Sequence, residues 1–249
     1  MRKLKIVIYL IVAGMSAPLF AGPSEEDWPE PIKSYRTGQI LFDRLEVTHT
    51  DNDDDLIVWD MLAWYGGDRN RLYFKSEGNN ERDDGEPSEF ESAEVLISRL
   101  IAPFWEIQGG VGARGSTASG ADRENYFVLS LFGTAPYRFE MDNSVTVNED
   151  GDIAATIEAE YDIRLSQVSY LQPRLEVAAA FTDAAAYERP SGFNDVRVGL
   201  RYRYELSREF APYIGVYWSR SLGNKADRIR DEGGDESEIG FVVGVRLWF

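Results

Sequence analysis

The final nine residues, Phe241–Phe249, constrain the fold more than any other stretch of the chain. Every second residue, from Phe241 to Phe249, is Phe, Val or Leu, whereas the intervening positions include Gly244, Arg246 and Trp248. Because a strand turns successive side chains to opposite faces, one face of this strand is a continuous apolar row. An apolar strand that ends on an aromatic residue is typical of the closing strand of a bacterial outer-membrane barrel. An edge strand of a soluble sandwich is the alternative.

Residues 1–21 have the pattern of a secretory signal peptide. Arg2, Lys3 and Lys5 precede an apolar stretch, residues 6–14, and Ala21 is the small residue before the predicted cleavage point. A retained membrane anchor is the alternative, but this stretch is short for a spanning helix, which needs about 17–25 residues. No later segment is long enough to span as a helix, so a membrane protein of this sequence must cross with strands.

The chain is acidic, with 43 Asp and Glu against 26 Lys and Arg, and a formal net charge of −17. Such a charge argues against nucleic acid and anionic lipid as partners and favours cations. A barrel reconciles this acidity with a membrane, because only alternate residues of each strand meet lipid. The chain has no cysteine, which excludes disulfides and thiolate metal sites.

Alternating or apolar runs fill the rest of the chain, and no segment has a convincing helical period with caps. The twelve predicted strands cover residues 39–49, 56–65, 70–77, 93–102, 104–114, 125–135, 137–148, 152–166, 169–182, 194–207, 210–222 and 237–249. We therefore expect an all-β chain: a signal peptide (1–21), a periplasmic N-terminal segment (22–38) and a transmembrane antiparallel up-and-down β-barrel of about 12 strands (39–249).

Short and long connections alternate between these predicted strands. The short ones contain residues 66–68, 102–103, 135–136, 167–168 and 208–209, and the long polar ones contain residues 51–55, 78–92, 115–124, 148–151, 183–193 and 223–236. Outer-membrane barrels have short turns at the periplasmic end and long loops outside. An even number of strands then places both termini in the periplasm.

Three predicted turns repeat the phrase Ala-Pro-aromatic, at residues 102–104, 135–137 and 211–213. Proline lacks the N–H that a sheet ladder needs, so it belongs at strand starts and turns. We expect the aromatic residues after it, Phe104, Tyr137 and Tyr213, to lie in the interfacial belt.

Charged residues share one parity in the eighth, ninth and tenth predicted strands. They are Glu158, Glu160, Asp162, Arg164, Arg174, Glu176, Arg197, Arg201, Arg203 and Glu205. A charge that faces lipid at mid-depth costs about 2–4 kcal/mol, so this parity must face the lumen. Pairing between the arginines and the carboxylates then either constricts a path for a small ion or forms a rigid interior network without a path.

His49 is the only histidine in the chain, and it adjoins the acidic run Asp51–Asp55. No Gly-flanked serine or matching carboxylate pair marks a hydrolytic site, so we do not expect an enzyme.

His49 is a candidate metal ligand beside these carboxylates, with a solvated loop histidine as the alternative. Acidic loops also suit hard cations that bridge loops or lipopolysaccharide. Soft ligands are scarce, because Met61 and Met141 are the only methionines after the signal peptide.

Several unusual phrases, in order along the chain, resemble the copper resistance protein B family. They are Leu41–Glu46, Gly66–Glu77, Ile101–Trp105, Ile157–Asp162, Leu171–Glu176, Phe210–Tyr213 and Leu247–Phe249. The resemblance implies an outer-membrane barrel that helps Gram-negative bacteria survive excess copper, by binding copper or moving it across that membrane. Members typically carry an N-terminal extension rich in Met and His, whereas Gly22–Thr37 contains neither residue.

These observations predict an outer-membrane barrel that binds or passes copper ions through an acidic, constricted lumen, with copper as ligand or cargo and no tightly bound cofactor. The predicted lumen attractors are Asp43, Glu46, Asp60, Glu106, Glu140, Glu158, Glu160, Asp162 and Glu176, with Arg174, Arg201 and Arg203 as their basic partners. Asp43 and Glu46 have opposite parity, so a regular strand turns only one of them inward. The alternatives are a structural or adhesive barrel that acts through its loops and a non-selective small-solute channel. Expected partners are outer-membrane lipid, lipopolysaccharide and a periplasmic copper-handling protein, but not nucleic acid.

Overall fold

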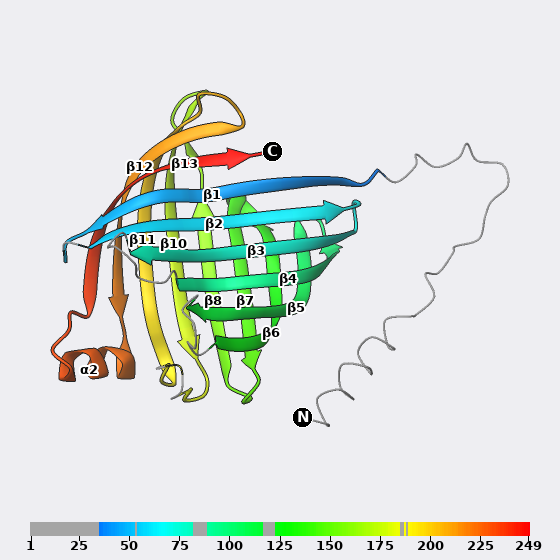
Figure 1. Ribbon diagram of the computed structural model, residues 1–249. Coiled ribbons are helices and arrows are strands. Elements are labelled where there is room, and N and C mark those ends of the chain that lie inside the picture. The colour runs from blue at the N-terminus through cyan, green and yellow to red at the C-terminus, as the bar shows by residue number, and fades with distance from the viewer. Residues whose placement is uncertain (1–34, 53, 82–88, 117–122, 185–186, 188) are drawn as a thin grey trace, which may run out of the picture. The chain divides into compact units, whose positions relative to one another are not determined.

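The computed structural model describes residues 35–52, 54–81, 89–116, 123–184, 187 and 189–249 (Figure 1). The expected signal peptide, residues 1–21, and residues 22–34 of the expected N-terminal segment lie outside this range. The first strand begins at Thr37, slightly before the expected start at residue 39.

Every strand of the described residues belongs to one antiparallel sheet. The strands are β1 (Thr37–Thr50), β2 (Asp55–Gly66), β3 (Asn70–Glu81), β4 (Glu89–Ala102), β5 (Trp105–Ser116), β6 (Arg123–Ala135), β7 (Phe139–Asn148), β8 (Ile153–Tyr161), β9 (Ile163–Arg164), β10 (Ser169–Ala180), β11 (Gly192–Tyr204), β12 (Phe210–Ser221) and β13 (Ser237–Trp248). β8 and β9 both pair with β10 and are interrupted only at Asp162. Counted as one, they bring the described sheet to twelve strands, and the predicted architecture is confirmed.

The sheet closes on itself through β1 and β13. At this seam the Ile40 N–H donates to the Phe249 carbonyl at 3.0 Å, and the Phe249 N–H donates to the Ile40 carbonyl at 2.9 Å. Closure pairs the backbone groups that an edge strand would leave open, which a sheet in lipid requires. The start of β1 and the end of the chain therefore lie at the same end of the barrel.

The connections distinguish two ends of the barrel. The short-turn end carries the turns after β2, β4, β6, β9 and β11, together with the seam residues Ile40 and Phe249. The long-loop end carries the connections after β1, β3, β5, β7, β10 and β12. The expected alternation is confirmed only in part, because the connections after β1 and β7 have four residues each and are no longer than the turns after β9 and β11.

One long connection contains a helix that the sequence did not predict: α2, Gly223–Asp231, at the long-loop end (Figure 1). The helix is polar almost all round, with Ala226 as its buried residue, so it has no apolar stripe to detect. Its N-cap residue, Leu222, has no side-chain capping hydrogen bond. Lys225 anchors the helix to the barrel through an ion pair of 2.7 Å with Asp195 on β11.

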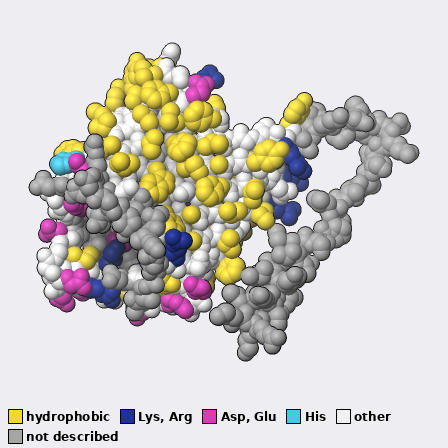
Figure 2. Space-filling view, in the orientation of Figure 1, with side chains coloured by type: hydrophobic (Ala, Val, Ile, Leu, Met, Phe, Trp, Pro, Cys, Tyr) yellow, Lys and Arg dark blue, Asp and Glu magenta, His cyan; other side chains and the backbone are white. Residues whose placement is uncertain are grey.

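The outer surface carries the apolar parity of the strands, and Figure 2 shows these side chains gathered over the barrel wall. In β13, for example, Phe241 and Val243 are 60% and 64% exposed, whereas Val242 between them is buried. This confirms the outward row predicted for the final strand. A search of the described residues finds no helix with the length and hydrophobicity needed to cross a membrane.

Two of the three Ala-Pro-aromatic phrases form turns at the short-turn end. Phe104 and Tyr137 are 76% and 86% exposed, and each adopts a φ of 67°. The prediction for the third phrase is wrong. Pro212 lies inside β12, so the alternation of the strand turns Tyr213 into the barrel, where it is 4% exposed.

Tyrosine rings lie against glycines on the inner wall. A Cβ added at Gly112 would come within 2.6 Å of the Tyr126 ring, and one at Gly244 within 2.7 Å of the Tyr213 ring. These glycines are on strands next to the tyrosines. The missing side chains allow the rings to lie flat along the wall, which positions their hydroxyls for the carboxylates described below.

Candidate cation path in the barrel lumen

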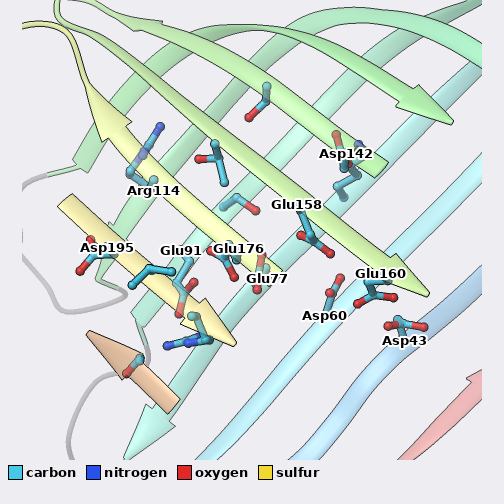
Figure 3. A pocket seen from close by; sticks show the side chains of 18 of the residues that line it. Asp43, Asp60, Glu77, Glu91, Arg114, Asp142, Glu158, Glu160, Glu176 and Asp195 are labelled. Carbon is cyan, nitrogen blue, oxygen red and sulfur yellow. Dashed lines mark hydrogen bonds and ion pairs between the residues drawn. The ribbon is translucent and has the colours of Figure 1, made fainter. Parts of the chain in front are cut away.

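A cavity of about 630 Å³ occupies the barrel interior and reaches the long-loop end near Asp195 and Lys225. Its lining contains fourteen Asp and Glu but only six Lys and Arg among the described residues. Figure 3 shows carboxylates from several strands pointing into this shared space, including those of Asp60, Glu158 and Glu176. The cavity is therefore strongly biased toward negative charge.

The predicted attractors are distributed between this cavity and its walls. Asp43, Asp60, Glu140, Glu158, Glu160 and Glu176 line it. Glu46 lines a smaller cavity of about 140 Å³ together with Arg174 and Arg201. Glu106 and Asp162 are not among the lining residues of either cavity.

A β-bulge at Asp43 resolves the conflict of parity in β1. The pairing of β1 with β2 shifts by one residue between Phe42 and Arg44, and the pairing with β13 shifts between Phe42 and Glu46. Such an extra residue re-aims the side chains that follow it. As a result both Asp43 and Glu46 face the interior, and so does Arg44, which is 2% exposed.

Carboxylates are aligned across β7, β8 and β10 by the register of these strands. Asp142 lies opposite Glu158, and Glu158 lies opposite Glu176. One level nearer the short-turn end, Glu140 lies opposite Glu160. Directly opposed residues on neighbouring strands have Cβ atoms about 4.5–5.5 Å apart, so these like charges require cations nearby.

Arg174 supplies one such cation at the centre of the wall. Its guanidinium lies 2.8 Å from Glu158 and 3.2 Å from Glu160, both on the adjacent strand β8. It also lies 3.6 Å from Asp60 on β2, which is separated from β10 in sheet order by the β1–β13 seam. Arg44 forms ion pairs with Asp60, at 3.2 Å, and with Glu77. The two arginines thus connect β1, β2, β3, β8 and β10 through the interior.

The other two predicted basic partners also form ion pairs. Arg201 binds Glu46 with two hydrogen bonds of 3.0 and 3.2 Å, and the Tyr213 hydroxyl donates to the same carboxylate at 2.9 Å. Arg203 lies 2.5 Å from Asp162 near the short-turn end. All three predicted arginines therefore lie inside the barrel beside predicted carboxylates.

Glu106 belongs to a separate cluster near the short-turn end. It accepts hydrogen bonds from Arg71 at 2.9 Å, Tyr73 at 3.0 Å and Ser98 at 2.5 Å. Its side chain is 11% exposed. With three partners on β3 and β4, Glu106 stabilises the wall rather than contributing a carboxylate to the cavity.

Sequence reasoning missed several interior charges on β3 to β6. Lys75 pairs with Asp142 at 2.5 Å, and Glu94 accepts a hydrogen bond from Tyr126 at 2.9 Å. Parity with the inward Tyr73 would have found Lys75 and Glu77, but β4 has no regular alternation to guide the assignment. Ser130 on β6 also faces inward and donates to Asp142 at 2.7 Å.

His49 lies at the long-loop rim, on the exposed parity of β1. Its Nδ1 is 2.9 Å from an Asp55 carboxylate oxygen, and its side chain is 59% exposed. Within the part of the chain that the structure describes, no group of three or more His, Cys, Asp or Glu side chains is arranged to hold a metal ion.

A closed antiparallel sheet with an apolar exterior and a charged interior is the architecture of a transmembrane β-barrel of the bacterial outer membrane. The fold is similar to that of the NanC porin, with a TM-score of 0.54 and 11% identity, over 84% of this chain and 98% of that one.

The family follows from sequence comparison. Residues 36–249 match the family model described as copper resistance protein B precursor (CopB). The chain is 36% identical to copper resistance protein B of Escherichia coli, over 84% of this chain and 69% of the relative. It is 35% identical to a copper resistance protein B homolog of Pseudomonas syringae pv. tomato, over 88% of this chain and 70% of the relative. The chain belongs to the copper resistance protein B family and is an outer-membrane barrel involved in copper resistance.

Proposed function

We propose that this barrel passes copper cations across the outer membrane through its acidic lumen. The excess of carboxylates in the cavity, fourteen against six cationic side chains among the described residues, is the observation that carries the proposal. Low-dielectric walls around such charges focus the electrostatic potential and raise the local concentration of cations. Copper is therefore cargo here, rather than a tightly bound cofactor.

The carboxylates are placed at successive levels along the barrel axis. Asp195, Glu236 and Glu238 line the cavity near the long-loop end, Glu158 and Glu176 line its middle, and Asp43, Glu140 and Glu160 lie nearer the short-turn end. A cation path needs several sites that attract an ion but release it to the next. The arginines moderate this attraction, since a lumen of uncompensated carboxylates would hold divalent ions too tightly.

We further propose that the short-turn end faces the periplasm. In this orientation the signal peptide, residues 1–21, is removed after export, and residues 22–38 lie in the periplasm, where a copper-handling protein can exchange ions with the lumen. The acidic long loops then face outward, where divalent cations can bridge them to lipopolysaccharide.

Reconstitution in lipid vesicles tests the proposed path. We expect the wild-type barrel to admit Cu²⁺ to a fluorescent chelator inside the vesicles and to favour cations over anions in reversal-potential measurements. The double variant Glu158→Gln/Glu160→Gln removes two lining carboxylates and leaves the positive charge of Arg174 behind. We expect it to lower both Cu²⁺ entry and cation preference by at least about twofold.

Asp227→Asn provides a matched control, because it removes a carboxylate on α2 that is 67% exposed and lies outside the cavity lining. This variant should behave as the wild type. Equal Cu²⁺ entry with the wild-type barrel and with empty vesicles would refute the proposal, and so would unchanged selectivity in the double variant. A conductance indifferent to ion charge would instead support a non-selective small-solute channel.

A further inference from the structure

The outer wall carries a groove at the short-turn end of β1 to β4. We propose that this groove and the arginines at its end bind one anionic phospholipid, with the lipid phosphate between Arg69 and Arg99 and an acyl chain over Ala63. The inference goes beyond the proposed copper path, because the groove faces lipid rather than the lumen. In the proposed orientation the site lies in the periplasmic leaflet of the outer membrane.

The groove is apolar and has a volume of about 620 Å³. Ala63 makes room for it, because this small residue lies directly between Ile40 on β1 and Phe74 on β3. Ile40 and Phe74 are exposed on the outer wall, and Ala63 shares their parity. The other outward residues of the lining are Gly38, Tyr65, Leu72, Val95 and Phe249. An acyl chain in this hollow has side chains on both flanks, so it gains dispersion contacts that a flat wall does not offer.

Two arginines lie together at the short-turn end of the groove. Arg99 continues the outward row of β4, two residues after the exposed Ile97, and is itself exposed. It lies directly opposite Asn70 on β3. Arg69 precedes Asn70 in the β2–β3 turn, and the Leu100 N–H donates to the Arg69 carbonyl at 2.8 Å. The two guanidiniums therefore start from neighbouring positions, which suits a phosphate that each of them binds with paired N–H donors.

The positive charge at this end of the wall is not neutralised within the protein. Among the described residues, no hydrogen bond or ion pair joins the side chain of Arg36, Arg69 or Arg99 to another group. Asp68 is the one acidic residue of the segments that meet here, 35–39, 66–70 and 99–105. Figure 2 shows Lys and Arg side chains gathered at this end, beside the hydrophobic surface. The chain is acidic as a whole, but this part of its outer wall is basic and attracts an anionic headgroup.

The depth of Arg99 places its guanidinium at the level of lipid headgroups. Arg99 is three residues from Ala102, the last residue of β4, which is about 10 Å along the strand. Because the strands of such barrels tilt by about 35–45°, the Arg99 backbone lies roughly 8 Å below the turn. A long arginine side chain returns its charge to the interface while its stem covers apolar wall. The phosphate is therefore within reach of Arg99, and the acyl chain below it enters the groove.

Native mass spectrometry of the full-length barrel tests the site, with phosphatidylglycerol and phosphatidylcholine of identical acyl chains in mixed micelles. We expect the wild type to retain phosphatidylglycerol over phosphatidylcholine by about twentyfold, since each arginine at a lipid surface contributes about fivefold. Arg69→Gln and Arg99→Gln should each lower this ratio about fivefold, and the double variant should bring it close to one. The control Arg138→Gln/Arg208→Gln removes two exposed arginines from other turns at the short-turn end and should keep the wild-type ratio.

A second pair of variants tests the groove without a change of charge. Ala63→Phe fills the hollow, and we expect it to lower the retention of phosphatidylglycerol by about threefold. Val198→Phe is the control, because Val198 is exposed on the outer face of β11 and lies outside the groove lining. This variant should retain phosphatidylglycerol as the wild type does.

The outcomes of these measurements are distinct. Equal retention of the two lipids by the wild type would overturn the inference, and so would a wild-type ratio in the Arg69→Gln/Arg99→Gln variant. Preferential retention of lipid A over phosphatidylglycerol would assign the arginines to lipopolysaccharide and refute the phospholipid site. No copper is present in these experiments, so their failure leaves the proposed copper path untouched, and failure of that path leaves this site untouched.

Discussion

Replacement of Arg174 by glutamine removes a buried cation that three carboxylates share. Its guanidinium lies between 2.8 and 3.6 Å from Glu158, Glu160 and Asp60, and the side chain is only 4% exposed. The carboxylates remain in the variant, two of them directly opposed to other carboxylates on neighbouring strands. The variant therefore keeps the desolvation cost of the acids and loses the attraction that offsets it.

The expected loss of stability follows from the exposure of these groups. Removal of one partner of a buried ion pair costs about 3–5 kcal/mol. Asp60 and Glu158 are each 25% exposed and Glu160 is 11% exposed, so water screens part of the repulsion. We expect Arg174→Gln to lower the free energy of unfolding by about 2–4 kcal/mol. Arg220→Gln, which breaks the 3.4 Å pair between the half-exposed Arg220 and Glu236, should destabilise the barrel far less.

Urea unfolding in lipid vesicles, followed by the fluorescence of the six tryptophans, measures both variants. Combination of Arg174→Gln with Glu158→Gln and Glu160→Gln should recover part of the lost stability, because it removes the uncompensated charges as well. If Arg174→Gln is no more destabilising than Arg220→Gln, the lumen ion pairs do not hold the inner wall, and the reasoning is wrong.

Three further predictions concern the wall, the lipid face and the long-loop end. Gly244→Ala should lower stability by about 1–3 kcal/mol because its Cβ would clash with a tyrosine ring, whereas Gly199→Ala, whose Cβ has no atom closer than 3.8 Å, should be tolerated in urea unfolding. Val243→Arg places a charge on the lipid face and should cost about 2–4 kcal/mol in the same assay. Asp183 has a lowered pKa in the folded protein, so its bond to Ser191 is stabilising above the usual carboxyl pKa of about 3.9 and is lost as the pH falls through the lower folded value. The chemical shift of the Ser191 amide should follow this titration, and Asp183→Asn should abolish it.

The sequence by itself determined the barrel. Outward and inward residues alternate with a period of two in stretches such as Ile153–Asp162 and Phe241–Phe249. This pattern is a local property of the chain, so it does not depend on which strand the stretch pairs with. Short and long connections likewise follow from local turn residues. For the same reason Arg174, Arg201 and Arg203 were placed correctly in the interior. The family phrases are also local, and the comparisons confirm the family that they indicated.

Tertiary structure decided which interior groups meet. The bulge at Asp43 depends on the pairing of β1 with both β2 and β13, so the strand pattern alone could not reveal that Asp43 and Glu46 both face inward. The contact of Arg174 with Asp60 and that of Arg189 with Glu124 join residues more than sixty positions apart in the chain. Such contacts arise from sheet closure and from the radius of the closed barrel, which bring opposite walls together. Local periodicity fixes the face of each residue in a regular strand, but only pairing with neighbouring strands places a bulge, and only closure fixes the partner across the lumen.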